Sequence, residues 1–442
     1  MALCSGLNWM LWKSNEREDI GLEDIRERAL LVGVDTGEEV DFDRMMDELK
    51  SLAQACNMEV VGIITQKLDV INKGLYIGTG KVAEVKEFAA ECEAQIIIFD
   101  NALSPSQLRN LQKELELPIL DRTTLILDIF AIRARTKEAK LQVETARLGY
   151  LLPRLVGLHE ALSRQGGGSG SMSNKGAGEK KLELDRRKIE HRITMLRQEL
   201  EEVEKERSVQ RKKRMNSRIP QVALVGYTNA GKSTVMNRLL EAYGGSEEKK
   251  VFEQNMLFAT LETSVRSIET GDNKPLFLVD TVGFIHKLPH GLVKAFHSTL
   301  EEVQYADLLV QVVDFSDPMY KQQMEVTKQT LAEIGAGDIP MIYVYNKCDL
   351  TTMDIPKVHE DHIYMAAGQS IGLEELITLI KQKVYADSVD VKFLIPYDKG
   401  NVVSYFMENS TVLETDYREG GVYLSVNCHR QDAEKYQQYI TD

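Results

Sequence analysis

Short apolar runs alternate with amphipathic stretches over residues 29–132. The apolar runs ALLVGV, EVVGIIT, AQIIIFD and LPILD each end at polar or turn residues, as buried strands do. Amphipathic stretches such as DFDRMMDELKSLAQAC and SPSQLRNLQKEL lie between them, and in the latter Ser104 is a candidate N-cap before Pro105. This alternation predicts a small parallel sheet covered by helices.

One turn between these elements, YIGTGK, contains two glycines and a lysine. It either holds a phosphate or forms a tight turn before the next helix. Because a glycine pair alone is a weak phosphate signal, the tight turn is the favoured interpretation.

The next segment has the pattern of two helices packed along a common seam. Leu141, Leu148, Leu152 and Leu155 are separated by seven, four and three residues. After a loop, apolar residues recur at alternating spacings of four and three, which is typical of coiled coils. We therefore expect an antiparallel helical hairpin, and its second seam consists of Ile189, Ile193, Leu196, Leu200 and Val203.

The hairpin is basic although the chain as a whole is acidic. Residues 133–218 contain 22 Lys and Arg against 12 Asp and Glu, whereas the complete chain has a net charge of −14. Its loop at residues 163–179 contains six glycines and cannot bury enough apolar surface to order itself. The asymmetry indicates either a localised contact with a polyanion or an ordinary charged hairpin. The candidate phosphate contacts are Arg164, Lys175, Lys180, Lys181, Arg211, Lys212, Lys213 and Arg214.

The composition, 43% hydrophobic and 28% charged, is that of a soluble globular protein. At 442 residues the chain is too long for one core, so we expect several domains. We find no sequence pattern of a membrane span or of a signal peptide, and we expect a monomeric cytoplasmic protein. The five cysteines are scattered without a C-x-x-C pair, which argues against a disulfide framework and a zinc site.

A phosphate-binding loop follows the apolar run QVALV. The segment GYTNAGKS has the Gly-x-x-x-x-Gly-Lys-Ser spacing between a predicted strand and the helical stretch VMNRLLEAY, which is the context this motif requires. Its glycines allow the backbone N–H groups to face phosphate oxygens, and Lys232 reaches the β- and γ-phosphates. The Ser233 hydroxyl is expected to bind Mg²⁺, and Thr234 is placed for the α-phosphate. The remaining loop residues are Gly226, Tyr227, Thr228, Asn229, Ala230 and Gly231.

Two later motifs identify the nucleotide. In DTVG, Asp280 supplies a second magnesium contact and the Gly283 N–H is placed for the γ-phosphate. In NKCD, the Asp349 carboxylate can accept both hydrogen-bond donors of guanine, a pair that adenine lacks. Asn346 is expected to fix this loop, and the stem of Lys347 to cover the purine. The three motifs in this order predict a GTP-binding domain with a mainly parallel sheet.

The switch segment and the catalytic water raise separate questions. In MLFATLETSVR, Thr260 is the candidate that closes over magnesium, with Thr263 as the alternative, and Phe258 is a further nucleotide-contact candidate. Phe284 occupies the position where many nucleotide hydrolases carry a glutamine that orients the attacking water. Either this chain does not hydrolyse its nucleotide or another group orients the water.

Together these segments resemble the HflX family of ribosome-associated GTPases. The resemblance extends from about residue 29 to the C-terminus and includes regions outside the GTPase core. It is carried by YIGTGKVAEVKE, DNALSPSQLRNL, DRTTLILDIFAIRARTKEAKLQVE, LLPRLV, SRQGGG, LELDRRKI, VALVGYTNAGKST and LIPYDKGNVVSYF.

The resemblance implies an α/β multidomain protein that hydrolyses GTP, binds rRNA of the large ribosomal subunit and splits or rescues stalled ribosomes. The serine of the family's guanine-seating Ser-Ala-Lys is replaced here, which leaves the backbone N–H groups of Ala366 and Ala367. The expected parts are an N-terminal extension (1–28), an N-terminal α/β domain (29–132), the hairpin (133–218), the GTPase (219–388) and a small C-terminal α/β domain (389–442).

Several hypotheses remain open for the activity. Without a water-orienting side chain, Lys232, Gly283 and Mg²⁺ would support slow turnover that the ribosome accelerates. Asn229 either holds a K⁺ ion near the phosphates or only braces the loop. The alternative function is a GTP-gated binding module with little turnover that regulates a non-ribosomal protein. A third hypothesis, that the N-terminal α/β domain is a small-molecule enzyme, is the least favoured because no paired catalytic residues appear in it.

Overall fold

The computed structural model describes residues 26–37, 41–164, 172–216, 219–244, 264–272, 274–286 and 302–441, with side chains at 155–182 and 210–218 outside this description. The chain forms two compact units. The first comprises Met1–Val203 and Lys287–Ala295, and the second comprises Glu204–His286 and Phe296–Asp442. None of the described helices is both long and apolar enough to span a membrane.

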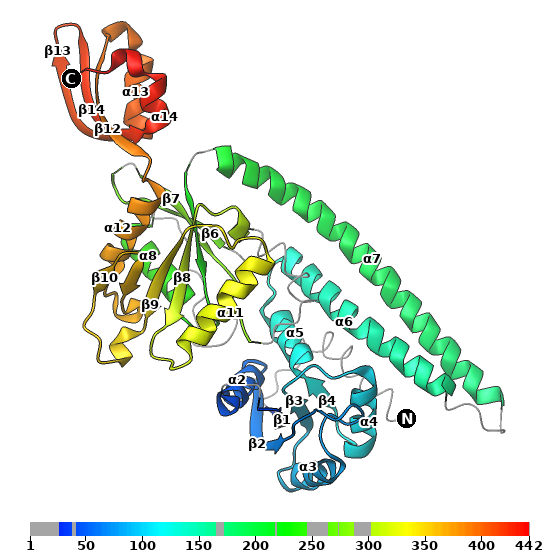
Figure 1. Ribbon diagram of the computed structural model, residues 1–442. Coiled ribbons are helices and arrows are strands. Elements are labelled where there is room, and N and C mark those ends of the chain that lie inside the picture. The colour runs from blue at the N-terminus through cyan, green and yellow to red at the C-terminus, as the bar shows by residue number, and fades with distance from the viewer. Residues whose placement is uncertain are drawn as a thin grey trace. The chain divides into compact units, whose positions relative to one another are not determined.

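A four-stranded parallel sheet in the order β2-β1-β3-β4 lies at the centre of the first unit, which confirms the predicted architecture (Figure 1). Its helices and strands alternate along the chain, and its core includes Leu30, Ile97 and Leu111. The elements are β1 (Glu27–Asp35), α2 (Phe42–Ala55), β2 (Met58–Lys67), α3 (Thr79–Glu91), β3 (Ile96–Phe99), α4 (Pro105–Leu115), β4 (Ile119–Asp121) and α5 (Arg122–Arg133).

Two helix starts in this unit follow the sequence prediction. Ser104 caps α4 because its hydroxyl accepts a hydrogen bond from Gln107 N (3.2 Å) and its N–H donates to Gln107 Oε1 (2.9 Å). Gly78 precedes α3 and donates its N–H to Gln66 Oε1 at 2.9 Å. The YIGTGK segment is therefore a turn before a helix in which a protein side chain already binds the glycine N–H.

Helix α6 (Lys137–Arg164) and the first part of α7 (Met172–Asn216) form the predicted antiparallel hairpin (Figure 1). A bidentate ion pair joins them, with Arg192 donating to both Glu144 oxygens at 2.8 and 3.0 Å. Helix α7 begins at Met172, earlier than the predicted loop end at residue 179. Extending an existing helix through two isolated glycines costs far less free energy than starting a new helix. The glycine content of residues 163–179 therefore predicts a longer loop than the structure has.

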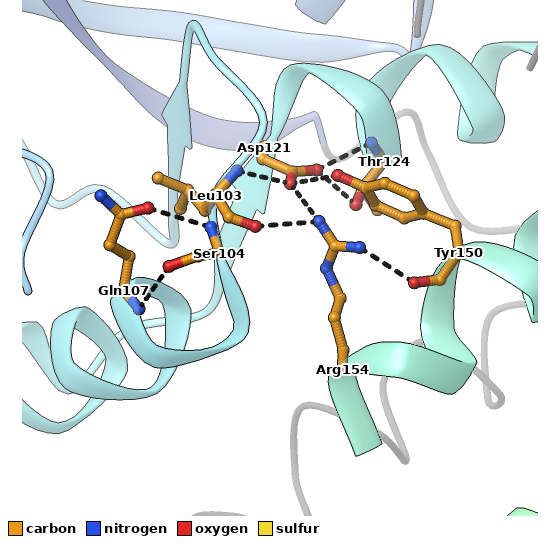
Figure 2. Close-up of polar contacts among 7 residues, drawn as sticks. All are labelled: Leu103, Ser104, Gln107, Asp121, Thr124, Tyr150 and Arg154. Carbon is orange, nitrogen blue, oxygen red and sulfur yellow. Dashed lines mark hydrogen bonds and ion pairs between the residues drawn. The ribbon is translucent and has the colours of Figure 1, made fainter. Parts of the chain in front are cut away.

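A buried carboxylate fixes α6 to the end of β4 (Figure 2). Asp121 Oδ2 accepts hydrogen bonds from Leu103 N (3.1 Å), Tyr150 Oη (2.5 Å) and Arg154 Nη2 (2.9 Å). Its Oδ1 accepts two more from the N–H and hydroxyl of Thr124, at 2.9 and 2.7 Å. Burial, together with the Asp121 charge, raises the pKa of Tyr150, so the phenol remains a donor. We call this group of five residues the Asp121 junction.

The second unit contains a seven-stranded sheet in the order β10-β11-β9-β8-β5-β7-β6, parallel except at its two edge strands. Helices α8 and α12 contribute to one buried face of this sheet, and α11 packs on β8. The elements are β5 (Gln221–Val225), α8 (Lys232–Tyr243), β6 (Ser264–Ile268), β7 (Leu276–Asp280), β8 (Leu308–Asp314), α11 (Tyr320–Glu333), β9 (Met341–Asn346), β10 (Lys357–His359), β11 (His362–Tyr364) and α12 (Leu373–Val384).

The C-terminal part of this unit is a small α+β fold. Its antiparallel sheet has the order β12-β14-β13 and packs on helices through Phe393, Phe406 and Leu424. The elements are β12 (Ser388–Ile395), α13 (Gly400–Asn409), β13 (Thr411–Arg418), β14 (Gly421–His429) and α14 (Arg430–Lys435).

Candidate nucleotide-binding site

The glycine-rich loop connects the end of β5 to the start of α8, as the motif predicts. Gly226 has φ +141° and Gly231 has φ +98°, backbone conformations that side chains disfavour. A Cβ at Gly226 would lie 2.2 Å from Val312 O, and one at Gly231 would lie 2.2 Å from Asn346 Nδ2. Both glycines are thus required by close packing against β8 and β9. Asn229, which is exposed, is left-handed with φ +61°.

Lys232 begins α8 and its ammonium is turned into the loop. Its Nζ donates hydrogen bonds to the carbonyl oxygens of Gly226 (3.0 Å) and Tyr227 (2.8 Å). Burial lowers the pKa of Lys232 to about 8, and the nearby Asp280 charge opposes this shift. The loop therefore surrounds a buried cation for which phosphate oxygens are stronger acceptors than carbonyl groups.

Ser233 and Asp280 come together at the ends of neighbouring elements. Strand β7 pairs with β5 and ends at Asp280, whose Oδ2 lies 3.0 Å from Ser233 Oγ. The next residue, Thr281, donates its hydroxyl to Leu224 O at 2.6 Å and so fixes the end of β7 to β5. A carboxylate and a hydroxyl are the hard oxygen donors that Mg²⁺ takes beside nucleotide phosphates, so this pair fits that ion.

The segment after Asp280 is joined to the glycine-rich loop through its backbone. Phe284 N donates to Gly226 O (3.1 Å), and Thr228 N donates to Phe284 O (2.8 Å). The Phe284 side chain is 2% exposed, so at the position of the missing glutamine it contributes packing and backbone hydrogen bonds only. A Cβ at Gly283 would lie 2.9 Å from both Lys232 Nζ and Thr228 Cα, which explains the glycine between the two segments.

Asn346, at the end of β9, connects three loops. Its Nδ2 donates to Ala230 O in the glycine-rich loop at 2.9 Å, and its Oδ1 accepts from Ala367 N at 2.9 Å. The side chain is 2% exposed. Ala366 and Ala367 are fully buried at this place, so the NKCD, AAG and glycine-rich segments share one contact point.

Lys347 and Asp349 of NKCD have side-chain partners that the sequence analysis missed. Lys347 Nζ lies 2.8 Å from Asp314 Oδ2 at the end of β8. The exposed Asp349 carboxylate accepts a hydrogen bond from Gln369 Nε2 at 3.2 Å. Asp314 lies at the end of β8, beside the end of β9 where the NKCD motif begins. Its place at the end of an apolar strand was the one sequence feature that could have indicated it. Nothing in the spacing of Gln369 indicates its contact.

The structure describes the remaining predicted site residues only in part. The switch candidates Phe258, Thr260 and Thr263 fall within residues 251–263. Thr234 is described, half-buried in the first turn of α8. The backbones of the basic candidates lie on α6 or α7, but their side chains are outside the description: Arg164, Lys175, Lys180, Lys181, Arg211, Lys212, Lys213 and Arg214.

A mainly parallel sheet, a glycine-rich loop before a helix, and the Asp280 and Asn346 loops at the strand ends define a P-loop GTPase. Family models support this class along most of the chain. "GTP-binding GTPase N-terminal" matches residues 43–131, "GTP-binding GTPase Middle Region" matches 133–214, and "50S ribosome-binding GTPase" matches 221–347.

Curated relatives extend this similarity over nearly the complete chain. GTPase HflX of Caldanaerobacter subterraneus subsp. tengcongensis is 44% identical over 430 residues, which cover 97% of each chain. GTPase HflX of Escherichia coli K12 is 38% identical over 411 residues, covering 91% of this chain and 94% of that protein. The chain belongs to the HflX family of GTPases, and the resemblance found in its sequence is confirmed.

Proposed function

We propose that GTP binds with its phosphates in the glycine-rich loop and its guanine against the NKCD and AAG segments. The main support is the Asn346 side chain, which is hydrogen-bonded to both Ala230 and Ala367. It thereby connects the glycine-rich loop, proposed for the phosphates, to the AAG segment (residues 366–368), proposed for the base. The proposed contacts are Gly226, Tyr227, Thr228, Asn229, Ala230, Gly231, Lys232, Ser233, Thr234, Phe258, Thr260, Asp280, Gly283, Asn346, Lys347, Asp349, Ala366 and Ala367.

Base selectivity tests this placement directly. Asp349→Asn replaces an acceptor-only carboxylate by an amide, which can donate to the extra carbonyl oxygen of xanthine. We expect GDP affinity to fall and XDP affinity to rise, measured by competition with a fluorescent nucleotide. A variant that keeps the wild-type preference for guanine would show that the base lies elsewhere.

Ser233 and Asp280, together with Thr260, would hold Mg²⁺ beside the β- and γ-phosphates. The ion would neutralise phosphate charge, while Lys232 and the Gly283 N–H bind phosphate oxygens. Ser233→Ala should raise the Mg²⁺ concentration needed for half-maximal GTP affinity. An unchanged Mg²⁺ titration would exclude Ser233 as a ligand.

We further propose that this GTPase binds the large ribosomal subunit and splits or rescues stalled ribosomes. Support comes from the family model over residues 221–347, whose description names 50S binding, and from the basic composition of residues 133–218. In this proposal the basic side chains of the hairpin contact rRNA phosphates. We also propose that the chain divides into five parts, with boundaries after residues 28, 132, 218 and 388.

Co-sedimentation with purified large subunits tests the ribosomal partner. Binding should need a GTP analogue and weaken steeply with salt, because each phosphate contact releases counterions. A double variant, Arg211→Gln with Lys212→Gln, should lower the salt dependence. Binding to another protein complex without any binding to subunits would instead favour a GTP-gated regulatory module.

Phe284 motivates a proposal about turnover. Since its side chain is apolar and buried, we propose that turnover is slow alone and that the docked subunit orients the attacking water. GTP turnover measured with and without subunits should differ by roughly 10²- to 10⁴-fold, the scale typical of a positioned general acid or base. Equal rates would reject this dependence.

Asn229 supports a second contribution to catalysis. Its left-handed backbone at an exposed loop position makes its side chain available to hold K⁺ near the phosphates. Replacing KCl by NaCl at constant ionic strength should then slow turnover several-fold, and Asn229→Ala should abolish the difference. If the two salts give equal turnover, Asn229 only braces the loop.

A further inference from the structure

We propose that Asp314 is a positioning residue for nucleotide binding, which fixes the Lys347 side chain before the base arrives. This inference rests on the proposed base-binding role of the NKCD loop. Asp314 belongs to none of the sequence motifs, and it acts through Lys347 without touching the nucleotide itself.

The two residues meet because their strands end side by side. Strands β8 and β9 are parallel neighbours, and Asp314 pairs with Asn346 at the last position of the ladder. One residue further, Phe315 N donates to Asn346 O at 2.9 Å. Lys347 follows with φ +61° and ψ +28°, a left-handed turn, and its Nζ lies 2.8 Å from Asp314 Oδ2. Both ends of the ion pair are thus set by the sheet.

Asp314 is itself held in place. Its Oδ1 accepts hydrogen bonds from Ser316 N (3.1 Å) and Ser316 Oγ (2.5 Å), which leaves Oδ2 directed to Lys347. The side chains of Asp314 and Lys347 are 18% and 25% exposed. Partial burial protects the pair from solvent screening, in contrast with exposed ion pairs whose contribution is small.

Aromatic packing makes the support rigid. The ring centroid of Phe315 lies 5.5 Å from that of Tyr345 and 5.4 Å from that of Tyr364. The rings of these two tyrosines stack with their centroids 4.7 Å apart. Cys348, directly after Lys347, is fully buried. The neighbours of Asp314 and Lys347 in the chain, Phe315 and Cys348, are therefore held by packing.

The consequence for binding is entropic. A lysine side chain has four flexible carbons, and covering a purine requires them to be ordered. When Asp314 holds the ammonium, much of that order exists before binding, so less conformational freedom is lost with the nucleotide. Removing the anchor should weaken nucleotide binding mainly through faster dissociation.

Asp314→Asn tests this role, because the amide oxygen can still accept the Ser316 hydrogen bonds while the charge is lost. We expect GDP affinity to fall by about three- to tenfold, the range for one side chain that must be ordered on binding. Asp317→Asn is the matched control, since Asp317 binds Met319 N and Gln323 in the same segment. Its GDP affinity should equal that of the wild type.

A double-mutant cycle separates positioning from a general structural role. Lys347→Met keeps an unbranched side chain without the ammonium, so adding Asp314→Asn to it should cause no further loss. Additive losses, or an unchanged affinity in Asp314→Asn, would overturn the proposal even if Asp349→Asn still changes base preference. If Asp349→Asn leaves base preference unchanged, the proposed base site itself fails.

Discussion

Asp121 and Asp280 are both buried carboxylates at the ends of parallel strands, one in each unit. Asp121 accepts five hydrogen bonds from the protein, including one from the Arg154 guanidinium. Asp280 accepts a hydrogen bond from the Ser233 hydroxyl, and its charge acts on the buried Lys232 ammonium. Lys232 itself donates hydrogen bonds to carbonyl groups of the glycine-rich loop.

The difference lies in what surrounds each carboxylate. At Asp121 the surrounding donors come from α4, α5 and α6 or their starts, so the charge holds secondary structure elements together. At Asp280 the neighbours are the Ser233 hydroxyl and the buried Lys232 ammonium, for which we propose contacts to Mg²⁺ and to phosphate, so this charge belongs to the proposed binding site. The same residue type at the same kind of strand end therefore holds helices together in one unit and lies in the proposed nucleotide site of the other.

The largest predicted effect is on GTP turnover of Asp280→Asn. If Asp280 holds Mg²⁺ as we propose, removing its charge should lower kcat/KM for GTP by roughly 10²- to 10³-fold, about 3–4 kcal/mol of transition-state stabilisation. Steady-state phosphate release measures this, and thermal unfolding should show that the variant is folded. Near-normal turnover would remove Asp280 from the magnesium site.

Asp121→Asn should show the reverse pattern. An amide cannot neutralise Arg154, and its NH₂ group would face donors, so we expect the first unit to lose about 3 kcal/mol of stability. Hydrogen exchange in peptides covering residues 100–125 and 145–154 should accelerate, while basal GTP turnover stays unchanged. Exchange at wild-type rates would show that the junction does not stabilise this unit.

The pH dependence of nucleotide affinity depends on Lys232. Its folded pKa of about 8 lies below the unfolded value of 10.5. The burial penalty on its charge is complete below pH 8 and is relieved as the pH rises towards 10.5, so the free protein gains stability. GDP affinity should change in the opposite direction and fall up to about tenfold per pH unit above 8. Lys232→Arg, which keeps its charge, provides the comparison, and parallel curves for both proteins would contradict the assignment.

The smallest predicted effect is that of Tyr150→Phe. This change removes one hydrogen bond to Asp121 but leaves the ring on which the Arg154 guanidinium stacks, 3.4 Å from its centroid. A loss of roughly 1–2 kcal/mol in stability of the first unit is expected, less than for Asp121→Asn. Chemical denaturation followed by hydrogen exchange can rank the two variants, and a larger loss for Tyr150→Phe would reverse the roles.

Features with a short range in sequence were predictable. The Ser104–Gln107 cap spans three residues, and the phosphate loop is a contiguous motif between a strand and a helix. Apolar periodicity also predicted the strands of the first unit and the two hairpin helices, because the same residues that repeat in sequence pack on one face.

Contacts between separate elements were not predictable in this way. Asp121 meets Tyr150 29 residues later and Arg154 33 residues later, and Lys347 is likewise 33 residues from Asp314. No periodicity connects such positions, since only the packing of α6 on α4 and α5, or of β8 beside β9, brings them together. The start of α7 was missed for a local reason, because glycine content alone does not fix where a helix begins.

The two backbone hydrogen bonds between Phe284 and the glycine-rich loop have a mechanical consequence. A docked macromolecule that pulls on the segment after Gly283 must either break both bonds or move Gly226 and Thr228 with it. Force applied at the surface would then reach the bound phosphates without any side chain relaying it. With the phosphates placed as proposed, a movement of this segment would be coupled to nucleotide release through the main chain alone.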